Sequence, residues 1–507
     1  MPIVNSILSW IMKQRIHQIE LFIKYPCEVQ EEWFKKLIQA GRFSEWGSTY
    51  DYASIKTIGD FQARIPIQDY ESLKPYINRL RNGEQRLLWS SEVKWFAKSS
   101  GTTSDKSKFI PVTTESLEDC HFKGGKDLLS IYCSNHPETG LFNGKLLSLG
   151  GSHQVNSFDN DSFYGDLSAI LIQNLPLWFQ IFRTPEISIA LMDEWEEKIE
   201  RIARSTIHED VTNISGVPSW TLVLLNRILE ITGKKNISEV WPNLELFIHG
   251  AVNFKPYVSQ FNNMIPNPGM NYYETYNASE GFFGIQDRDK SDEMLLMLDY
   301  GVFYEFIAVD EMKSGNQKAL TLDQVKTGVN YAIIITTNAG LWRYQIGDTV
   351  MFTSLFPFRI KITGRTASFI NAFGEEVIVE NAESAITSAC HQTSAIIREY
   401  TASPVYYSGK MSGAHEWLIE FEKEPDSLEN FISVLDEQLK NLNSDYEAKR
   451  YKDMVLRAPI VRKMPYNSFY RWLKSKEKLG GQHKVPRLSN DRKIVDEILQ
   501  LTEITII

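Results

Sequence analysis

Apolar residues recur at helical spacing near the N-terminus, within residues 3 to 40. The recurring positions include Ile11, Phe22 and Leu37, and this spacing predicts two helices that cover a neighbouring domain. Residues 194 to 203 repeat the pattern with acidic residues on the opposite face, which is typical of a helix with a solvated side. We interpret both segments as structural.

Shorter apolar runs predict strands that end in small or polar residues. Val93, Trp95 and Ala97 recur at strand spacing, and residues 244 to 252 form a buried run that Gly250 interrupts. His249 in this run is expected to be a hydrogen-bonded core residue, since no Ser or Cys nucleophile motif accompanies it. The polar segments that follow the strands are therefore the candidate sites.

Length and charge narrow the class of protein. A chain of 507 residues exceeds what one core usually serves, so at least two domains are expected. With 43% hydrophobic and 23% charged residues, the composition is that of a globular protein. The net charge of −10 argues against a nucleic acid or an anionic membrane as the main partner, and a small-molecule ligand fits better.

The four cysteines, Cys27, Cys120, Cys133 and Cys390, are far apart and form no Cys-x-x-Cys pair. This spacing predicts reduced thiols and no structural zinc. The N-terminal segment has no basic leader or small-residue cleavage site, and no apolar run approaches the roughly 20 residues of a membrane helix. We expect a cytoplasmic monomer.

A run of hydroxyl side chains at residues 99 to 105 follows the first predicted strand. The hydroxyls of Ser99, Ser100, Thr102 and Thr103 could face phosphate oxygens together with backbone N–H groups, while Gly101 would let the backbone approach closely. The Gly-x-x-x-x-Gly-Lys-Ser/Thr string of a Walker A loop does not occur. By itself this segment is either a phosphate-binding loop or a solvated surface loop.

Three later segments also carry polar chemistry. Residues 272 to 284 pass from an aromatic strand into a small polar turn that holds Glu280. Asp348 comes directly after a glycine at a predicted strand end, where a carboxylate can accept two hydrogen bonds from a ribose diol. Gly364-Arg365 is followed by a Gly-Glu turn at residues 374 and 375 that leads into a helix. Each segment alone could be an ordinary acidic or glycine turn.

The order of these motifs is informative: Ser-Ser-Gly-Thr-Thr, Tyr-x-x-Ser-Glu, Tyr-x-x-Gly-Asp, and Gly-Arg with a following Gly-Glu. The series resembles the core motifs of the adenylate-forming superfamily. Four further stretches are similar to the Gretchen Hagen family of acyl acid amido synthetases, which includes plant auxin-responsive enzymes and bacterial relatives: residues 66–77, 279–284, 442–446 with Arg450, and 482–487. The similarity runs from about residue 60 to the end.

The resemblance implies an α/β fold. A large N-terminal multi-sheet α/β domain would occupy residues 1–366, and a smaller, mobile C-terminal α+β domain would occupy residues 367–507. The active site would lie between them, with residues 364–369 as the hinge.

The resemblance also implies a two-step reaction that uses ATP and Mg²⁺. A carboxylic acid would attack the α-phosphorus of ATP to give acyl-AMP and pyrophosphate, and an amine, such as that of an amino acid, would then form the amide. An acyl-CoA ligase with the same first step and a non-catalytic binding protein are the alternatives. No cationic cluster for the CoA phosphates is evident, and a non-catalytic relative would more readily have lost Glu280 or Asp348.

The family motifs assign roles to residues of this chain. Ser100, Thr102, Thr103, Glu280 and Lys484 would be catalytic, with Glu280 as the metal ligand. Lys484 matches the family's Lys-x-Pro-Arg motif and stands in the small domain, where ligases of the superfamily usually place a catalytic lysine. Glu376 departs from the family pattern, since some plant relatives carry Lys there. The nucleotide would be held by Ser99, Ser100, Gly101, Thr102, Thr103, Gly250, Ala251, Tyr276, Asn277, Ala278, Ser279, Glu280, Asp348 and Arg365.

Overall fold

The computed structural model describes most of the chain. The described residues are 2–100, 107–150, 155–158, 161–192, 194–252, 254, 257–313, 318–365, 369–406, 412–476 and 485–503. The chain divides into two compact units, the first made of residues 1–99, 109–254 and 261–366 and the second of residues 100–108, 255–260 and 367–507. Two short segments thus group with the second unit, and the expected division at residue 366 stays a prediction.

The first unit contains a mixed sheet of eleven strands. Its parallel part runs in the order β9-β8-β7-β3-β6, and antiparallel strands continue from β9 in the order β10-β11-β15-β14-β13-β12. The bounds are β3 Lys145–Ser148, β6 Arg183–Thr184, β7 Val211–Ser215, β8 Leu246–Gly250, β9 Asn271–Ala278, β10 Gly281–Ile285, β11 Met294–Leu296, β12 Val302–Ala308, β13 Asn330–Thr337, β14 Tyr344–Leu355 and β15 Phe358–Arg365. Strand β9 is therefore where parallel pairing changes to antiparallel pairing.

A second sheet has four strands in the order β2-β1-β5-β4. Strand β1 pairs in parallel with β5, and β4 pairs with β5 in the antiparallel sense. The bounds are β1 Trp95–Ser100, β2 Ser107–Val112, β4 Asn156–Ser157 and β5 Phe163–Gly165.

Three helices occupy the N-terminal region, where the apolar spacing predicted two: α1 Pro2–Gln14, α2 Ile16–Lys24 and α3 Pro26–Gly41. Pro26 begins α3, as expected for a residue without an N–H group to donate. Arg15, between α1 and α2, donates from Nε and Nη2 to the carboxylate of Asp127 at 2.8 and 2.9 Å. This buried ion pair fixes the break between the first two helices against α8 (Lys123–Asn135).

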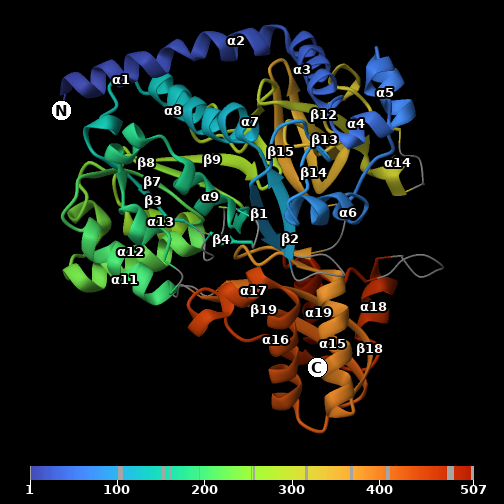
Figure 1. Cartoon of the computed structure of the whole chain (residues 1–507). Helices are drawn as coiled ribbons and strands as arrows, with labels where there is room; N and C mark the ends of the chain where they lie inside the picture. Colours follow the sequence, from blue (N-terminus) through green and yellow to red (C-terminus); the bar gives the residue numbers. More distant parts are fainter. Residues whose placement is uncertain are drawn as a thin grey trace. The chain divides into compact units, whose positions relative to one another are not determined.

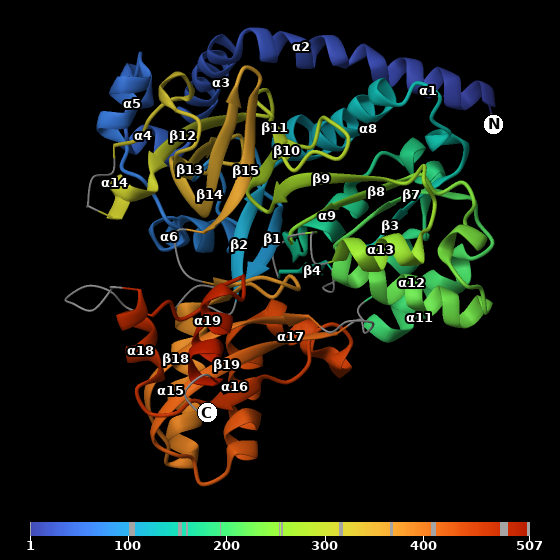
Figure 2. The ribbon, with the colours of Figure 1, turned by 180° about the vertical axis from the view of Figure 1, so that it is seen from behind.

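The remaining helices of the first unit surround its sheets. Helices α1 to α3 run along one side, next to α8 and β12 (Figure 1), whereas α11 and α12 lie beside β3, β7 and β8 (Figure 2). Helix α13 is divided between the two units after residue 260. The bounds are α4 Glu45–Thr49, α5 Ile58–Arg64, α6 Tyr70–Arg81, α7 Thr114–Ser116, α9 Leu167–Asn174, α10 Ile187–Ala190, α11 Trp195–Thr206, α12 Pro218–Thr232, α13 Val258–Met264 and α14 Val309–Lys313.

The second unit is built around the sheet β18-β19-β20. Leu418 on β19 packs with Phe469, Trp472 and Val495 of α18 and α19, while Phe421, on the opposite face, contacts Phe431 of α16. The bounds are β16 Phe369–Ile370, β17 Val377–Ile378, β18 Ile396–Tyr406, β19 Gly413–Lys423, β20 Ile460–Lys463, α15 Val379–Thr393, α16 Leu428–Leu442, α17 Ser444–Arg450, α18 Ser468–Ser475 and α19 Lys493–Glu503. The expected α/β class, with a smaller α+β part, is confirmed.

Among the described residues, none of the helices has the length and apolar character needed to cross a membrane.

Candidate functional site

The carboxyl ends of β8 and β9 bring several predicted residues together. Gly250 ends β8 opposite Thr275 on β9, and a Cβ atom at Gly250 would lie 2.6 Å from the Thr275 carbonyl oxygen. Ala251 follows with φ of 68°, so the chain turns away directly after the strand. Close packing against β9 thus requires glycine at 250. In open α/β sheets this carboxyl edge is where ligands bind.

A tight hairpin carries the predicted acidic turn. Ala278 on β9 pairs with Gly281 on β10, which leaves Ser279 and Glu280 as a two-residue turn. Tyr276, Asn277 and Ala278 are the last residues of β9. The expected passage from an aromatic strand into a polar turn is therefore observed, and it places Glu280 beyond the carboxyl end of β9.

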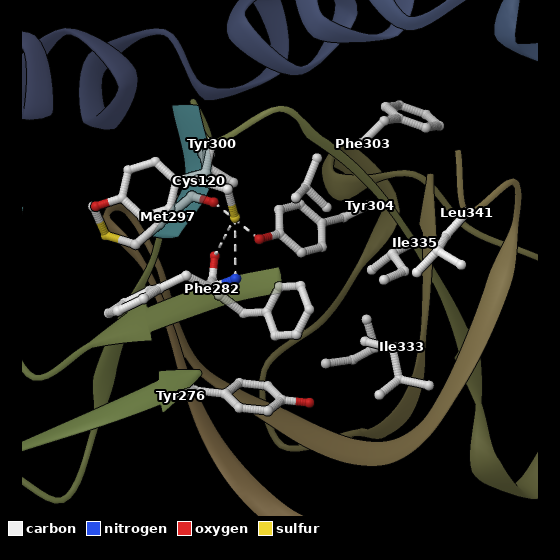
Figure 3. Packing of buried hydrophobic residues seen from close by; sticks show 14 of the residues in the cluster. Cys120, Tyr276, Phe282, Met297, Tyr300, Phe303, Tyr304, Ile333, Ile335 and Leu341 are labelled. Carbon is white, nitrogen blue, oxygen red and sulfur yellow. Dashed lines mark hydrogen bonds between the residues drawn. The ribbon is translucent and has the colours of Figure 1, made fainter. Parts of the chain in front are cut away.

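Tyr276 and Asp348 are joined by a hydrogen bond. The Tyr276 hydroxyl, on a side chain that is 5% exposed, donates to Asp348 Oδ2 at 2.6 Å. Strands β9 and β14 are four places apart in the sheet, which corresponds to about 19 Å in a flat sheet. Because the two side chains nevertheless touch, the antiparallel part of the eleven-stranded sheet must curl. Figure 3 shows the resulting interior, where Tyr276, Ile333 and Ile335 lie around one core.

Asp348 lies inside β14, which corrects the expectation that it sits at a strand end. The register of β14 shifts against β13 between Ala332 and Ile334, and against β15 after Thr349. Gly347, with φ of 94°, allows the chain to bulge at this point. Because the bulge breaks the regular alternation of side chains between the two faces of β14, the Asp348 carboxylate does not follow the direction that a regular strand would give it.

A buried ion pair fixes the turn that leads into β14. Arg343, with φ of 46°, donates from Nε and Nη2 to the Glu305 carboxylate at 3.0 and 2.8 Å. Its Nη1 donates to the Ile65 carbonyl at 2.6 Å. This pair anchors the start of the strand that carries Asp348 to β12 and to the end of α5.

His121 is a site residue that sequence reasoning missed. It lies in the π-helical turn η2 (Leu117–Phe122), with its Nδ1 3.1 Å from Asn277 Oδ1. Burial lowers the pKa of His121 to about 4, against the opposing effect of the Asn277 hydrogen bond, so the imidazole is neutral at pH 7. No motif surrounds this residue, and its only sequence signal is a histidine within an apolar helical stretch.

Other predicted residues are placed only in part. Ser99 and Ser100 belong to β1, which corrects the expectation that the loop begins at Ser99. Gly101, Thr102, Thr103 and Lys484 lie outside the described residues, as does the centre of the expected hinge at 366–368. Arg365 is the last residue of β15, and it is the register partner of Asp348.

The acidic residues of the site limit the kind of metal that could bind. Within the described ranges, no three His, Cys, Asp or Glu side chains are grouped so that they could hold a metal ion. Mg²⁺ is often bound by one or two carboxylates together with substrate phosphates and water. Glu280 fits such a site only if phosphate oxygens supply the other ligands.

His249 is buried, as expected, at 4% exposure. Burial lowers its pKa to about 3, and its Nδ1 has no hydrogen-bond partner in the part of the chain that the structure describes. Its ring stacks on Phe254 with centroids 4.0 Å apart. The core position of His249 is confirmed, whereas the expected hydrogen bond of Nδ1 is not found among the described residues, where the ring is held by stacking.

Three family models match the chain in order: the GH3 family N-terminal domain over residues 15–270, the central domain over 295–365 and the C-terminal domain over 380–493. The chain belongs to the GH3 family. The family resemblance stated from the sequence motifs is thereby confirmed. The matches include strand β8 in the N-terminal domain and strands β14 and β15 in the central domain, whereas the hairpin β9–β10 lies between the matched ranges.

Curated relatives of this GH3 protein extend over most of its length. It is 22% identical to indole-3-acetic acid-amido synthetase GH3.3 of Arabidopsis thaliana, over 90% of this chain and 89% of the relative. It is 24% identical to the 4-substituted benzoates-glutamate ligase GH3.12 of the same plant, over 84% of this chain and 87% of the relative. A jasmonoyl-L-amino acid synthetase of Nicotiana attenuata is 25% identical to it, over 66% of this chain and 68% of the relative.

Solved structures show the fold of the GH3 protein. GH3.15 acyl acid amido synthetase has a TM-score of 0.62 at 16% identity, covering 96% of both chains. A 2-hydroxyisobutyryl-CoA ligase has a TM-score of 0.56 at 13% identity, covering 94% of this chain and 92% of the ligase. Amide-forming and thioester-forming ligases therefore share this fold.

Proposed function

We propose that this GH3 protein is an ATP-dependent acyl acid amido synthetase, a ligase that forms a carbon–nitrogen bond. The Tyr276–Asp348 hydrogen bond carries the proposal, because it brings Tyr-x-x-Ser-Glu and Tyr-x-x-Gly-Asp together at the carboxyl edge of a GH3 sheet. In the first step an acid carboxylate attacks the α-phosphorus of ATP and pyrophosphate leaves. In the second step an amine attacks the acyl carbonyl, and AMP leaves.

The nucleotide is held by residues from several strands. Gly250 and Ala251 line the adenine at the end of β8, and Tyr276 and Asn277, with Ala278 and Ser279, lie at the base and the α-phosphate. Asp348 and Arg365, which are register partners on β14 and β15, hold the ribose. The bulge at Gly347 supports this role, since it turns the carboxylate away from the strand pairing.

Charge on the leaving pyrophosphate is balanced by fixed groups. The hydroxyls and backbone N–H groups of residues 99–103 bind phosphate oxygens, and this electrostatic contribution needs no covalent intermediate with the protein. Glu280 holds Mg²⁺ together with the phosphates of ATP. When bound, Mg²⁺ neutralises developing phosphate charge. The single carboxylate at a hairpin turn supports this arrangement, because Mg²⁺ rarely requires an all-protein cage.

Residues 1–366 and 367–507 act as a large and a mobile small domain in this proposal, with the hinge at residues 364–369. Lys484 in the small domain assists catalysis. We further propose that the protein works as a cytoplasmic monomer on small-molecule substrates.

An amino acid is the proposed acceptor, and the names of the glutamate ligase and the jasmonoyl-amino acid synthetase support it. An acyl-CoA ligase is the second candidate, since the 2-hydroxyisobutyryl-CoA ligase has the same fold. The family match favours the amide, because all three GH3 models match the chain.

A substrate screen tests the proposal. Purified protein is incubated with Mg-ATP and a panel of carboxylic acids, and pyrophosphate release identifies the acid. Amino acids or CoA are then added, and product mass distinguishes an amide from a thioester. Acid-dependent pyrophosphate release followed by amide is the expected result. A thioester product would instead assign the protein as an acyl-CoA ligase, and no release with any acid would contradict the proposed reaction.

A further inference from the structure

The end of β9 is held from both of its faces. Tyr276 and Asn277 are consecutive strand residues, so their side chains point to opposite sides. Tyr276 is bonded to Asp348 on one side, and Asn277 is bonded to His121 on the other. Asn277 belongs to the proposed nucleotide site, whereas the family motifs give His121 no part in it.

The π-helical turn η2 docks on the hairpin β9–β10 through consecutive residues. Cys120 Sγ accepts a hydrogen bond from the Phe282 N–H at 3.1 Å, and His121 reaches Asn277, which is the register partner of Phe282. Successive side chains of a regular α-helix are spread around its axis by 3.6 residues per turn. The wider π-helical turn instead lets the neighbouring residues Cys120 and His121 both contact the paired strand residues Phe282 and Asn277. Such turns are frequent at functional sites.

The start of α8 holds this contact in place. A Cβ atom at Gly124 would lie 2.6 Å from the Phe282 ring, so the helix backbone packs directly on the hairpin. Figure 3 shows the Cys120 sulfur beside the backbone of Phe282, with the Tyr304 side chain also pointing toward it. His121 is 5% exposed, which leaves its ring little freedom to rotate.

The chemistry of this contact fixes the orientation of the Asn277 carboxamide. A neutral imidazole carries one N–H group, and next to the carboxamide oxygen that proton belongs on Nδ1, which donates to Oδ1. The Nδ2 group of Asn277 then points elsewhere with two N–H donors, and within the described residues it has no hydrogen-bond partner. An outward-facing amide N–H suits an anionic oxygen.

We propose that His121 is a positioning residue, which holds the Asn277 carboxamide with its N–H groups directed at a phosphate oxygen of the bound nucleotide. The inference rests on the proposed function, since it needs a nucleotide at the end of β9. Without the His121 donor, the carboxamide can flip and present its oxygen to the phosphate, which is repulsive.

Calorimetric titration of the full-length protein with Mg-ATP and, separately, with adenosine tests the proposal. His121→Phe keeps a buried ring and loses the donor, and it should weaken ATP binding by roughly tenfold, the scale of one hydrogen bond to a charged group. Adenosine, which lacks phosphates, should bind as to the wild type. His121→Asn retains an N–H donor near the Nδ1 position and should restore most of the ATP affinity. Cys120→Ala, which loosens the same turn without touching Asn277, is the matched control and should leave ATP affinity unchanged.

A double-mutant cycle separates positioning from general damage. In an Asn277→Ala background, His121→Phe should cause no further loss of ATP affinity. Equal ATP binding by His121→Phe and wild type, an equal loss of ATP and adenosine, or the same loss in the Asn277→Ala background would overturn the inference. If His121→Phe does not fold, Asn277→Asp decides, because it keeps the acceptor for His121 and replaces the N–H donors with a repelling oxygen. Wild-type ATP affinity in Asn277→Asp would overturn the inference alone, whereas a wild-type protein that binds no ATP would overturn the proposed function with it.

Discussion

The Tyr276 hydroxyl donates a hydrogen bond of 2.6 Å to Asp348, across 72 positions of sequence. This bond holds the carboxylate that we assign to the ribose. Tyr276→Phe should therefore lower the affinity for ATP by roughly tenfold to a hundredfold, since a hydrogen bond to a charged group contributes about 1.5–3 kcal/mol and tenfold corresponds to about 1.4 kcal/mol. Calorimetry with ATP measures the change, and Asp348→Ala should weaken binding at least as much.

A second buried tyrosine provides the control for Tyr276→Phe. Tyr304 is fully buried, and its hydroxyl donates to the Met297 carbonyl at 3.1 Å, a bond that does not involve Asp348. Tyr304→Phe should lower the melting temperature to a similar extent and leave ATP affinity unchanged. Equal ATP affinities in the wild type and Tyr276→Phe would remove Tyr276 from the nucleotide site.

Glu280 is expected to act in the adenylation step. Glu280→Gln should preserve the fold and slow acid-dependent pyrophosphate exchange by at least about tenfold, because a neutral amide is a poorer Mg²⁺ ligand than a carboxylate. The loss should be partly recovered as magnesium is raised. Glu293→Gln, which removes a carboxylate paired with Arg288 outside the hairpin turn, is the matched control. Wild-type exchange by Glu280→Gln at every magnesium concentration would exclude a metal-binding role.

Two glycines should respond to alanine in opposite directions. Gly250→Ala places a methyl group 2.6 Å from the Thr275 carbonyl oxygen and should lower the free energy of unfolding by about 1–3 kcal/mol, as overpacking does. Gly125 in α8 has no atom within 4 Å of the added Cβ. Gly125→Ala should raise stability by roughly 0.5–1 kcal/mol, the usual gain from replacing glycine inside a helix. Urea unfolding of the two variants tests the difference in sign.

The buried His249 should make stability depend on pH. Its pKa falls to about 3 in the folded protein, so the unfolded chain takes up this proton first as the pH decreases through the usual value near 6.5. The folded state is therefore destabilised progressively between about pH 6.5 and 3. His249→Phe removes this contribution, and its melting temperature should improve relative to the wild type as the pH is lowered from neutral.

His17→Gln is the control for that measurement, since the His17 side chain is 81% exposed. Its melting temperature should follow that of the wild type at every pH. A constant difference between His249→Phe and wild type across the pH range would show that His249 does not titrate differently in the two states.

Local features of the fold could be predicted from the sequence. Asp69 caps α6 through a capping box with Ser72, and the Ser279-Glu280 turn joins two strands, because caps and tight turns depend on neighbouring residues. The motifs at Gly250 and Glu280 likewise lie at one edge of the sheet, where the parallel order of β8 and β9 puts them.

Other features depend on contacts between distant segments and could not be read from local patterns. The bulge at Asp348 appears only when β14 is aligned with two partner strands, and the alternation of residues 344–350 does not reveal it. The His121–Asn277 contact requires a π-helical turn to meet a hairpin 156 positions later. The break at Arg15 similarly follows from an acid on α8, which helical periodicity does not encode.

The curl of the sheet has a consequence for fragments of this protein. A piece that ends before Tyr344 contains the complete Tyr276-to-Glu280 motif, yet it lacks β14 and β15, the strands that bring Asp348 to Tyr276. Grafting the motif onto another scaffold would transfer its sequence without the curled sheet that brings Asp348 to Tyr276. Dividing the gene between β13 and β14 would separate the same two residues. If the proposed site is correct, nucleotide binding depends on the curled sheet as a whole, and complementing halves should recover it only when their strands pair.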